Sequence, residues 1–412
     1  MAKIDKHICI IGAGTAGIML ANKLANKFEV TVIDPAKDHY YQPGFLFMPF
    51  GRYKAEQLRK STTKLVNKRA NLIAEKVANI DFQNKKLATD SGTDISFDVL
   101  VVATGTRTDP SMTEGLLGDG WQKNVFDFYN PDGAEKLHDA LKDFKQGTLA
   151  IQIMDMPIKC PVAPLEFTFL ADDYFKKRGI RENITIKYIT PLSGAFTKPV
   201  ASAKFGHMLE ERKIELVSDF YTEKVVETEN KVVCFDGREV IYDLLVTVPV
   251  NVGSDLMRKT DIVNDLGFVE VNHGSLQSAK YPFVFAVGDA ADLPTSKAGS
   301  VAHFEVDTLA ENIPRFLEGK ELEESFDGHS NCFVEMGGGK ALLLDFNYQT
   351  QPYEGTFPFP GVGPMKLLQP SRVNHWGKLA FRFIYWWMLL PGRKIPFINA
   401  QMSLKGKKII ES

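Results

Sequence analysis

Two cysteines lie in sequence surroundings that suit thiol chemistry. Cys160 lies in the proline-rich segment Met154–Pro164, directly after Lys159. The thiolate is the nucleophilic form of cysteine, and a neighbouring cation favours it. Cys332 occurs much later, in a less distinctive segment. Either residue can instead be a small buried apolar side chain, and this alternative is stronger for Cys332.

A carboxylate and a helix follow Cys160. The residues from Leu165 to Arg178 predict a helix, whose N-terminus would also stabilise a thiolate. Glu166, at the start of this helix, can transfer protons as a general acid or base. The other cysteines, Cys9 and Cys234, lie in apolar predicted strands and are expected in the core. With only four cysteines, the chain is no disulfide scaffold.

The first strand and the turn after it organise the N-terminal part of the chain. The apolar run Ile8–Ile11 leads into Gly12-Ala-Gly14-Thr-Ala16-Gly17, a predicted helix over residues 18–27, and a strand over 28–33 that ends in Asp34. This order is the βαβ fingerprint of dinucleotide binding, in which the glycines admit the pyrophosphate and the acid accepts from a ribose. The alternative is a tight turn that binds no ligand.

Three later segments fit the rest of a flavin site. Ala103-Thr104-Gly105 ends a predicted strand over residues 95–102, and Gly288-Asp289 ends another buried strand. Lys297-Ala298-Gly299 precedes a helix predicted over 300–317, whose N-terminus and Lys297 can stabilise negative charge on a reduced flavin. Together with the first βαβ unit, these segments favour FAD.

A second α/β unit begins at the strand predicted over residues 148–153. Met154–Pro164 follows it directly and contains no glycine, so a second dinucleotide fingerprint is absent. A nicotinamide nucleotide is therefore not expected there. Further strands are predicted over residues 72–81, 85–89, 184–189, 225–235 and 244–248, and further helices over 135–144 and 201–213.

Composition limits the classes of function. The chain has 412 residues, enough for two or three domains, with 44% hydrophobic residues and a formal net charge of -2. Nothing in this charge points to nucleic acid. No segment is long and apolar enough for a spanning helix, and Met1–His7 contains no apolar signal region. No metal site is expected.

Taken together, these motifs resemble sulfide:quinone oxidoreductases. The resemblance rests on the N-terminal fingerprint, Tyr41–Gly44, Lys159–Glu166, Val287–Ala290 and Cys332-Phe333, and extends to Gly363–Lys366 and His375–Lys378. Cys-Pro-x-Ala-Pro is its most specific part. Flavocytochrome c sulfide dehydrogenase shares the fold and the cysteine pair, but it is exported, and the missing signal region argues against it.

The resemblance implies a redox-active pair formed by Cys160 and Cys332. Sulfide would attack the oxidised pair and leave a persulfide on Cys160, and Cys332 would then attack the flavin C(4a) carbon. The reduced flavin would pass two electrons to a quinone. Some relatives carry a third cysteine where this chain has Phe126–Asn130, so mechanisms that need it are not expected here. The candidate histidines for proton transfer, His207, His303 and His375, are expected to be structural.

The expected site residues form three groups. The catalytic group comprises Cys160, Cys332 and Glu166. The FAD-binding group comprises Gly12, Gly14, Ala16, Gly17, Asp34, Gln42, Pro43, Val77, Ala103, Thr104, Gly105, Gly288, Asp289, Lys297, Ala298 and Gly299. Aromatic residues that would line a quinone route are Phe333, Phe357, Phe359 and Tyr385.

The end of the chain suggests attachment to a membrane surface. Residues 378–390 predict an aromatic helix too short to span a bilayer, with Lys378 and Arg382 one turn apart and Arg393-Lys394 after it. Basic residues beside Trp and Tyr suit a helix in the plane of the interface. A buried core or dimer helix is the alternative. We therefore expect a peripheral protein of the cell membrane, with its face and its oligomeric state left open.

The expected fold is α/β, with two Rossmann-like domains in the glutathione reductase-like arrangement and a C-terminal membrane-associating region. Residues 1–113 and 250–318 would form the FAD domain, 114–249 the second domain, and 319–412 the C-terminal region. The expected function is sulfide:quinone oxidoreductase, with sulfide and a membrane quinone as partners. The alternatives are a type II NADH:quinone dehydrogenase, which needs the missing fingerprint, and a non-catalytic flavin-fold redox sensor.

Overall fold

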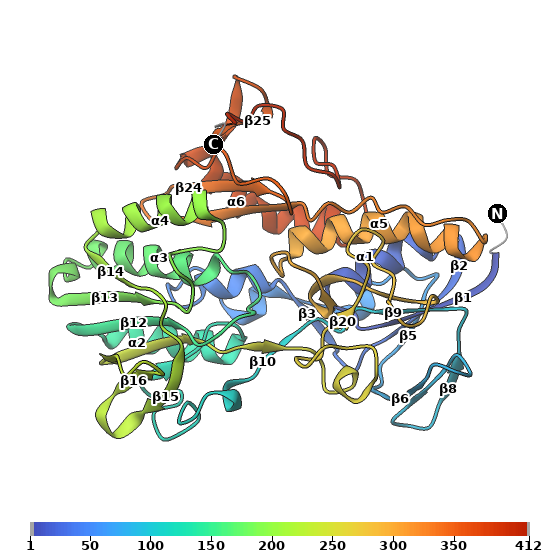
Figure 1. Cartoon of the computed structure of the whole chain (residues 1–412), viewed down its shortest axis with the longest axis horizontal. Helices are drawn as coiled ribbons and strands as arrows, with labels where there is room; N and C mark the ends of the chain where they lie inside the picture. The colour runs from blue at the N-terminus through green and yellow to red at the C-terminus, as the bar shows by residue number, and fades with distance from the viewer. Residues whose placement is uncertain (1–3, 410–412) are drawn as a thin grey trace.

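The computed structural model describes residues 4–409. Two α/β units lie side by side, and a C-terminal sheet with helix α6 lies along one side of both (Figure 1). Residues 1–3 and 410–412 lie outside the described part of the chain. They include the start of Met1–His7, where no signal region is predicted, and the outer ends of the predicted FAD domain and C-terminal region.

The first unit is built on a parallel sheet of order β21-β9-β1-β2-β5. Its strands are β1 (Ile4–Ile11), β2 (Phe28–Ile33), β5 (Asn71–Ile73), β9 (Val99–Val102) and β21 (Val284–Ala286). Helices α1 (Thr15–Leu24) and α5 (Gly299–Leu317) pack against each other beside it. A parallel sheet is covered on both faces, which is why β9, β21 and the buried half of β1 are apolar throughout. The late strand β21 therefore belongs with the N-terminal βαβ unit.

Two strands predicted in this unit are wrong in extent. The predicted strand over residues 72–81 is broken into β5 and β6 (Val77–Asp81), and that over 95–102 into β8 (Asp94–Ser96) and β9. Strands β6, β7 (Lys86–Thr89) and β8 form a separate antiparallel sheet. The breaks fall at residues 74–76 and 97–98, where the chain passes from one sheet to the other.

The second unit has a parallel sheet of order β11-β18-β12-β13-β14. The strands are β11 (Val125–Phe126), β12 (Gly147–Ile153), β13 (Ile184–Ile189), β14 (Ile214–Val217) and β18 (Leu244–Val248). Its helices are α2 (Pro131–Asp143), α3 (Ala163–Lys177) and α4 (Pro199–Glu211). The single strand predicted over residues 225–235 is wrong: β15 (Thr222–Val226), β16 (Lys231–Cys234) and β17 (Glu239–Ile241) form a small antiparallel sheet, with Asn230 in a left-handed turn.

The C-terminal region contributes a four-stranded sheet of order β23-β24-β26-β25. Its strands are β23 (Ser330–Glu335), β24 (Ala341–Phe346), β25 (Gly355–Phe359) and β26 (Gly363–Leu367). Helix α6 (Arg372–Ile384) packs on β23 and β24, and a π-helical turn over Tyr385–Leu389 extends it. Strand β23 also contacts α3 and α5, so this region joins both units.

Short elements complete the chain. Two-stranded pairs are β3 (Asp38–Tyr40) with β4 (Arg59–Ser61), β10 (Arg107–Thr108) with β19 (Asn251–Val252), and β20 (Val269–Glu270) with β22 (Ala291–Asp292). Short 3-10 helices occur at Gln42–Phe47, Ala55–Leu58, Thr62–Lys64, Pro110–Met112, Arg181–Asn183, Glu227–Glu229, Met257–Lys259 and Gly288–Ala290. The predicted domain boundaries remain a prediction, although β10 pairs with β19 close to two of them.

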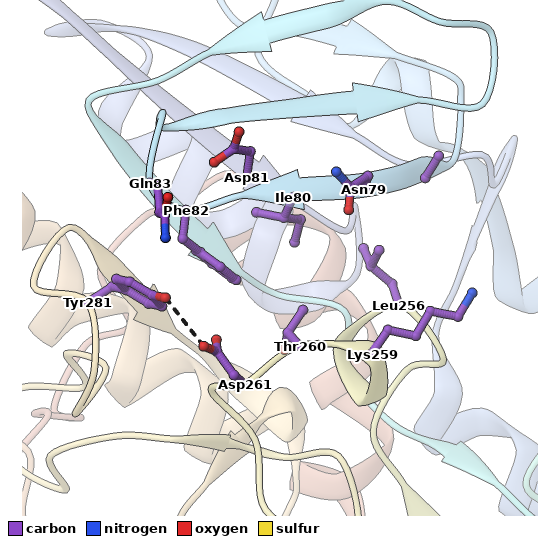
Figure 2. Close-up of a pocket in the computed structure, with 11 residues that line it drawn as sticks. Asn79, Ile80, Asp81, Phe82, Gln83, Leu256, Lys259, Thr260, Asp261 and Tyr281 are labelled. Carbon is purple, nitrogen blue, oxygen red and sulfur yellow. Dashed lines mark hydrogen bonds between the residues drawn. The ribbon is translucent and has the colours of Figure 1, made fainter.

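Neither a membrane span nor the described cavity identifies the function. Within residues 4–409, no helix combines the length and apolarity needed to cross a bilayer. A cavity of about 400 Å³ lies between β6 and the segment 256–261, where Phe82 stacks on Tyr281 (Figure 2). No residue predicted to belong to the FAD, cysteine or quinone site lines this cavity.

Candidate functional site

The glycine-rich loop leaves room only for glycine at two positions. Gly12 has a φ of +106°, and a Cβ there would collide with the carbonyl of Ala103. A Cβ on Gly17 would collide with the carbonyl of Gly12. The first strand, α1 and the end of β9 therefore meet at backbone distance, which is the close approach that a bound pyrophosphate requires.

Asp34 closes this loop at the end of β2. Its Oδ2 accepts from the backbone N–H of Ala13 at 2.6 Å, and its Oδ1 accepts from that of Ala36 at 2.7 Å. Beside the loop, Thr104 Oγ1 is buried and has no hydrogen-bond partner among the described residues. An unpartnered buried hydroxyl next to a glycine-rich loop fits a site that a polar ligand completes.

The second flavin element lies against the first. Gly288 has a φ of +70°, and its Cβ position is 3.1 Å from the side chain of Ala16 in α1. Burial raises the pKa of Asp289, while the charges of Lys297 and Lys159 oppose the increase. Lys297 Nζ donates to the carbonyls of Asp289 at 3.0 Å and Ala291 at 2.9 Å. Its ammonium group therefore holds the Gly-Asp turn in place.

The remaining predicted FAD-binding residues lie around these elements. Gly14 caps α1, Ala298 caps α5, and Gly299 begins α5. Gln42 and Pro43 begin a 3-10 helix, and Gln42 Oε1 accepts from Lys159 Nζ at 3.0 Å. Gly105 has a φ of +64° and open space around it, and Val77 lies half-buried in β6. These residues fit FAD, which supplies two-electron redox chemistry when bound.

Cys160, from the second α/β unit, and Cys332, from strand β23 of the C-terminal sheet, both lie at the start of α5. The N–H of Cys160 donates to the carbonyl of Lys297 at 2.7 Å, just before α5. Cys332 Sγ lies 3.9 Å from Ser300 Oγ, in the first turn of α5. Each cysteine is free, and the charge of Cys332 affects the pKa of Cys160. Helix α5 thus brings the two thiols to the Gly288-Asp289 side of the predicted flavin site.

The backbone at Cys160 is strained. Its φ is +50°, in the left-handed region that non-glycine residues rarely occupy. Two hydrogen bonds hold it, one to Lys297 and one from the N–H of Ala163 to its own carbonyl at 2.8 Å. Strain of this kind persists only where surrounding contacts fix it, and it concentrates at functional sites.

Burial disfavours both thiolates and one lysine opposes that effect. Burial raises the pKa of the Cys160 thiol strongly and that of Cys332 to about 11. The ammonium group of Lys378 lowers the pKa of both thiols. Lys378, rather than Lys159, is therefore the cation that favours the thiolate form of both cysteines. The amine of Lys159 instead bonds Gln42.

Lys378 was assigned wrongly from the sequence. The predicted basic face of an interfacial helix placed it at the surface, but its side chain is only 11% exposed. Lys378 Nζ donates to Glu166 Oε1 at 2.7 Å and to the carbonyl of Phe333 at 2.9 Å. Periodicity on an isolated helix cannot show this, because the packing of α6 on β23 and the ion pair with Glu166 of α3 are tertiary contacts.

The predicted quinone residues do not form one group. Phe333 touches α6, where a Cβ on Gly377 would lie 2.8 Å from its ring. Phe359 is 49% exposed and packs on Phe397, and Phe357 is half-buried in the same strand. Tyr385 is buried, and its hydroxyl lies 2.7 Å from Thr15 Oγ1 at the first nucleotide loop.

His39 is a residue that the sequence analysis missed. It is buried, and its Nδ1 donates to the carbonyl of Ala13 at 3.1 Å. Its Nε2 lies 2.5 Å from the hydroxyl of Tyr385, and burial lowers its pKa to about 4. The only signal in the sequence was the position of His39 in an aromatic loop after Asp34. That position does not show whether a residue contacts the glycine-rich loop.

The fold and these elements define the class of protein as an FAD-dependent α/β oxidoreductase. Residues 6–152 match the family model described as pyridine nucleotide-disulphide oxidoreductase. The predicted fold class and cofactor are therefore confirmed.

Along most of its length the chain is similar to sulfide:quinone oxidoreductases, as predicted. It is 29% identical to the mitochondrial sulfide:quinone oxidoreductase of Schizosaccharomyces pombe, over 93% of this chain and 90% of that protein. It is 26% identical to the mitochondrial enzyme of Mus musculus, over 95% and 88% respectively. The crystal structure of the enzyme from Aquifex aeolicus superposes with a TM-score of 0.80 and 22% identity, over 94% of this chain and 92% of that one.

Proposed function

We propose that this protein is a sulfide:quinone oxidoreductase that uses FAD. The observation that carries the proposal is the meeting of Cys160 and Cys332 at α5, beside the Gly288-Asp289 turn. A two-cysteine centre at a flavin site can exchange electrons with a sulfur substrate. The full-length similarity to sulfide:quinone oxidoreductases supports sulfide as that substrate.

The cysteine chemistry follows from ordinary thiol–disulfide exchange. With the pair oxidised, hydrosulfide attacks Sγ of Cys160, a new S–S bond forms, and the Cys160–Cys332 bond breaks. Cys332 leaves as a thiolate, which the ammonium group of Lys378 stabilises. Glu166, buried and bonded to Lys378, is placed to accept the proton of the persulfide. FAD held by the Gly12–Gly17 loop and the Gly288-Asp289 turn would supply the two-electron redox chemistry that connects the cysteine pair with a quinone.

The electron acceptor implies contact with a membrane, and the C-terminal region offers a surface for it. Aromatic side chains that are at least 60% exposed occur on α6 and just after it: Trp376, Phe383, Trp387 and Phe397. Lys60 Nζ lies 4.6 Å and 4.8 Å from the ring centroids of Trp386 and Trp387. Exposed aromatic residues beside cations suit attachment to a membrane interface, which we propose for this face.

The type II NADH:quinone dehydrogenase alternative is less well supported. Its nucleotide site would lie where β12 ends, but the chain there has Met154–Pro164, with Met154 buried and no glycine. A backbone without glycine cannot approach a pyrophosphate closely. This segment instead contains Cys160, whose backbone N–H donates to the carbonyl of Lys297 just before α5.

Anaerobic mixing with sulfide tests the proposal against both alternatives. The flavin absorbance is followed after addition of sulfide or NADH, and a short-chain quinone is then added. We expect bleaching by sulfide but not by NADH, recovery with quinone, and loss of bleaching in Cys160→Ser and Cys332→Ser. Cys234→Ser, a buried cysteine in β16, is the matched control. Bleaching by NADH alone would support the dehydrogenase, and no bleaching by either would support a redox sensor.

A further inference from the structure

A buried carboxylate with one free oxygen lies beside the two cysteines. Glu166 is 1% exposed, and its Oε1 accepts from Lys378 Nζ at 2.7 Å and from the backbone N–H of Glu335 at 2.7 Å. Its Oε2 is buried and has no hydrogen-bond partner within residues 4–409. This oxygen is available to take a proton, because nothing in the described structure occupies its lone pairs.

A second buried carboxylate connects this position with the surface. The side chain of Glu335, at the end of β23, is 1% exposed. Nδ1 of His375 lies 2.8 Å and 3.0 Å from its two carboxylate oxygens. The His375 side chain is 16% exposed, and the next residue, Trp376, is 68% exposed. Glu335 is thus joined to Glu166 through its backbone N–H and to the partly exposed His375 through its carboxylate.

Burial and the surrounding charges together place the pKa of Glu335 near neutral pH. Burial raises the pKa of Glu335 to about 7, and burial also lowers the pKa of His375. Lys378 and Arg52 oppose the increase at Glu335, whereas Asp173 adds to it. Arg52 and Lys177 disfavour the charged form of His375. A group that titrates near neutral pH can both accept and release a proton there.

We propose that Glu166, Glu335 and His375 form the path by which the proton of the sulfide substrate leaves the buried cysteine site. This inference rests on the proposed function. In the oxidative half-step, hydrosulfide and the Cys160–Cys332 disulfide give a Cys160 persulfide anion, a Cys332 thiolate and one proton. The proton must leave, because a buried site that keeps it returns the persulfide to its neutral, less reactive form.

Each group has a distinct part in the path. Glu166 takes the proton on its free oxygen and passes it to the carboxylate of Glu335, and the charge of Lys378 acts on both carboxylates. Protonated Glu335 then donates to Nδ1 of His375, and the imidazolium releases a proton to water. The expectation that His375 is only structural is replaced by this role.

Chemical rescue tests the proposal. In His375→Ala, we expect flavin bleaching by sulfide to slow by about tenfold or more, because a positioned proton-transfer group is missing. Added imidazole should restore the rate, since a small base can enter the space that the ring leaves. His207→Ala, an exposed histidine on α4, is the matched control and should leave the rate unchanged. Proton release is followed in parallel with an indicator dye in weak buffer.

The outcomes separate the proposal from simple structural loss. Unchanged bleaching in His375→Ala, or slowed bleaching that imidazole does not restore, would overturn the path. Glu335→Gln gives a second test. Flavin bleaching by sulfide should slow in this variant, and imidazole should not restore the rate, because the missing proton-transfer group is then buried inside the protein. If the unaltered protein is not bleached by sulfide at all, the proposed function itself fails and the path with it.

Discussion

The hydroxyl of Tyr385 lies 2.5 Å from Nε2 of His39 and 2.7 Å from Oγ1 of Thr15. His39 also bonds the carbonyl of Ala13, so a residue just after α6 is tied to the glycine-rich loop. The predicted membrane-facing region and the predicted FAD site are therefore mechanically linked, although more than 300 residues separate them along the chain.

Tyr385→Phe should weaken both the fold and the retention of FAD. The substitution leaves Nε2 of His39 buried without a partner, which costs about 1–3 kcal/mol. We expect a lower melting temperature and faster loss of flavin on dilution, measured by fluorescence. Tyr40→Phe is the matched control, because the Tyr40 hydroxyl makes no hydrogen bond within the described residues and its ring packs on Phe45. An equal effect of the two substitutions would contradict the link.

His39 should make stability fall in mild acid. Its pKa is lowered to about 4 in the folded protein, against 6.5 for an exposed histidine. The unfolded chain therefore takes up a proton first, and stability that is complete above pH 6.5 is lost as the pH falls toward 4. The loss amounts to roughly 3 kcal/mol. Urea unfolding at a series of pH values measures it, and His39→Gln should show a flatter profile over this window.

Lys378→Met should make the thiols of Cys160 and Cys332 less reactive. The ammonium group of Lys378 lowers the pKa of Cys160 and Cys332, so its removal raises both values. Alkylation of the reduced protein by iodoacetamide should then require a higher pH. Removing one partner of the buried pair with Glu166 should also destabilise the fold by about 3–5 kcal/mol.

Two companions make the Lys378 prediction specific. Lys366→Met removes an exposed lysine from β26 and should leave the alkylation profile unchanged. Lys378→Met combined with Glu166→Gln removes both charges and should recover much of the lost stability without recovering thiol reactivity. If alkylation of Lys378→Met follows the same pH curve as the unaltered protein, the cation does not act on the thiols.

Exposed aromatic residues on α6 should govern binding to lipid vesicles. Phe383 is 60% and Trp387 63% exposed, and replacing both by serine removes apolar area that a bilayer would bury. We expect binding to fall by roughly tenfold or more in co-sedimentation with phosphatidylcholine vesicles. Phe235→Ser, at a 73% exposed phenylalanine beyond β16, should have no effect. Equal binding by all variants would remove this face from the membrane proposal.

The sequence by itself determined the parts of this protein whose chemistry is local. Gly12 and Gly17, the acid Asp34 and the missing glycines of Met154–Pro164 can be recognised without a structure, because tight turns and backbone approach depend on residue type at fixed spacing. The strands β2, β13 and β18 were predicted with the bounds that the structure gives, since each is rich in apolar and β-branched residues.

Only the tertiary structure decided which distant residues act together. Lys378 was assigned to a membrane surface and His375 to a structural role, but the packing of α6 on β23 places them beside Glu166 and Glu335. His39 gave no signal, since its partner Tyr385 follows α6 at the other end of the chain. Local pattern records which face of an element is apolar. It does not record which other element covers that face, and burial by that element sets the charge and pKa of each group.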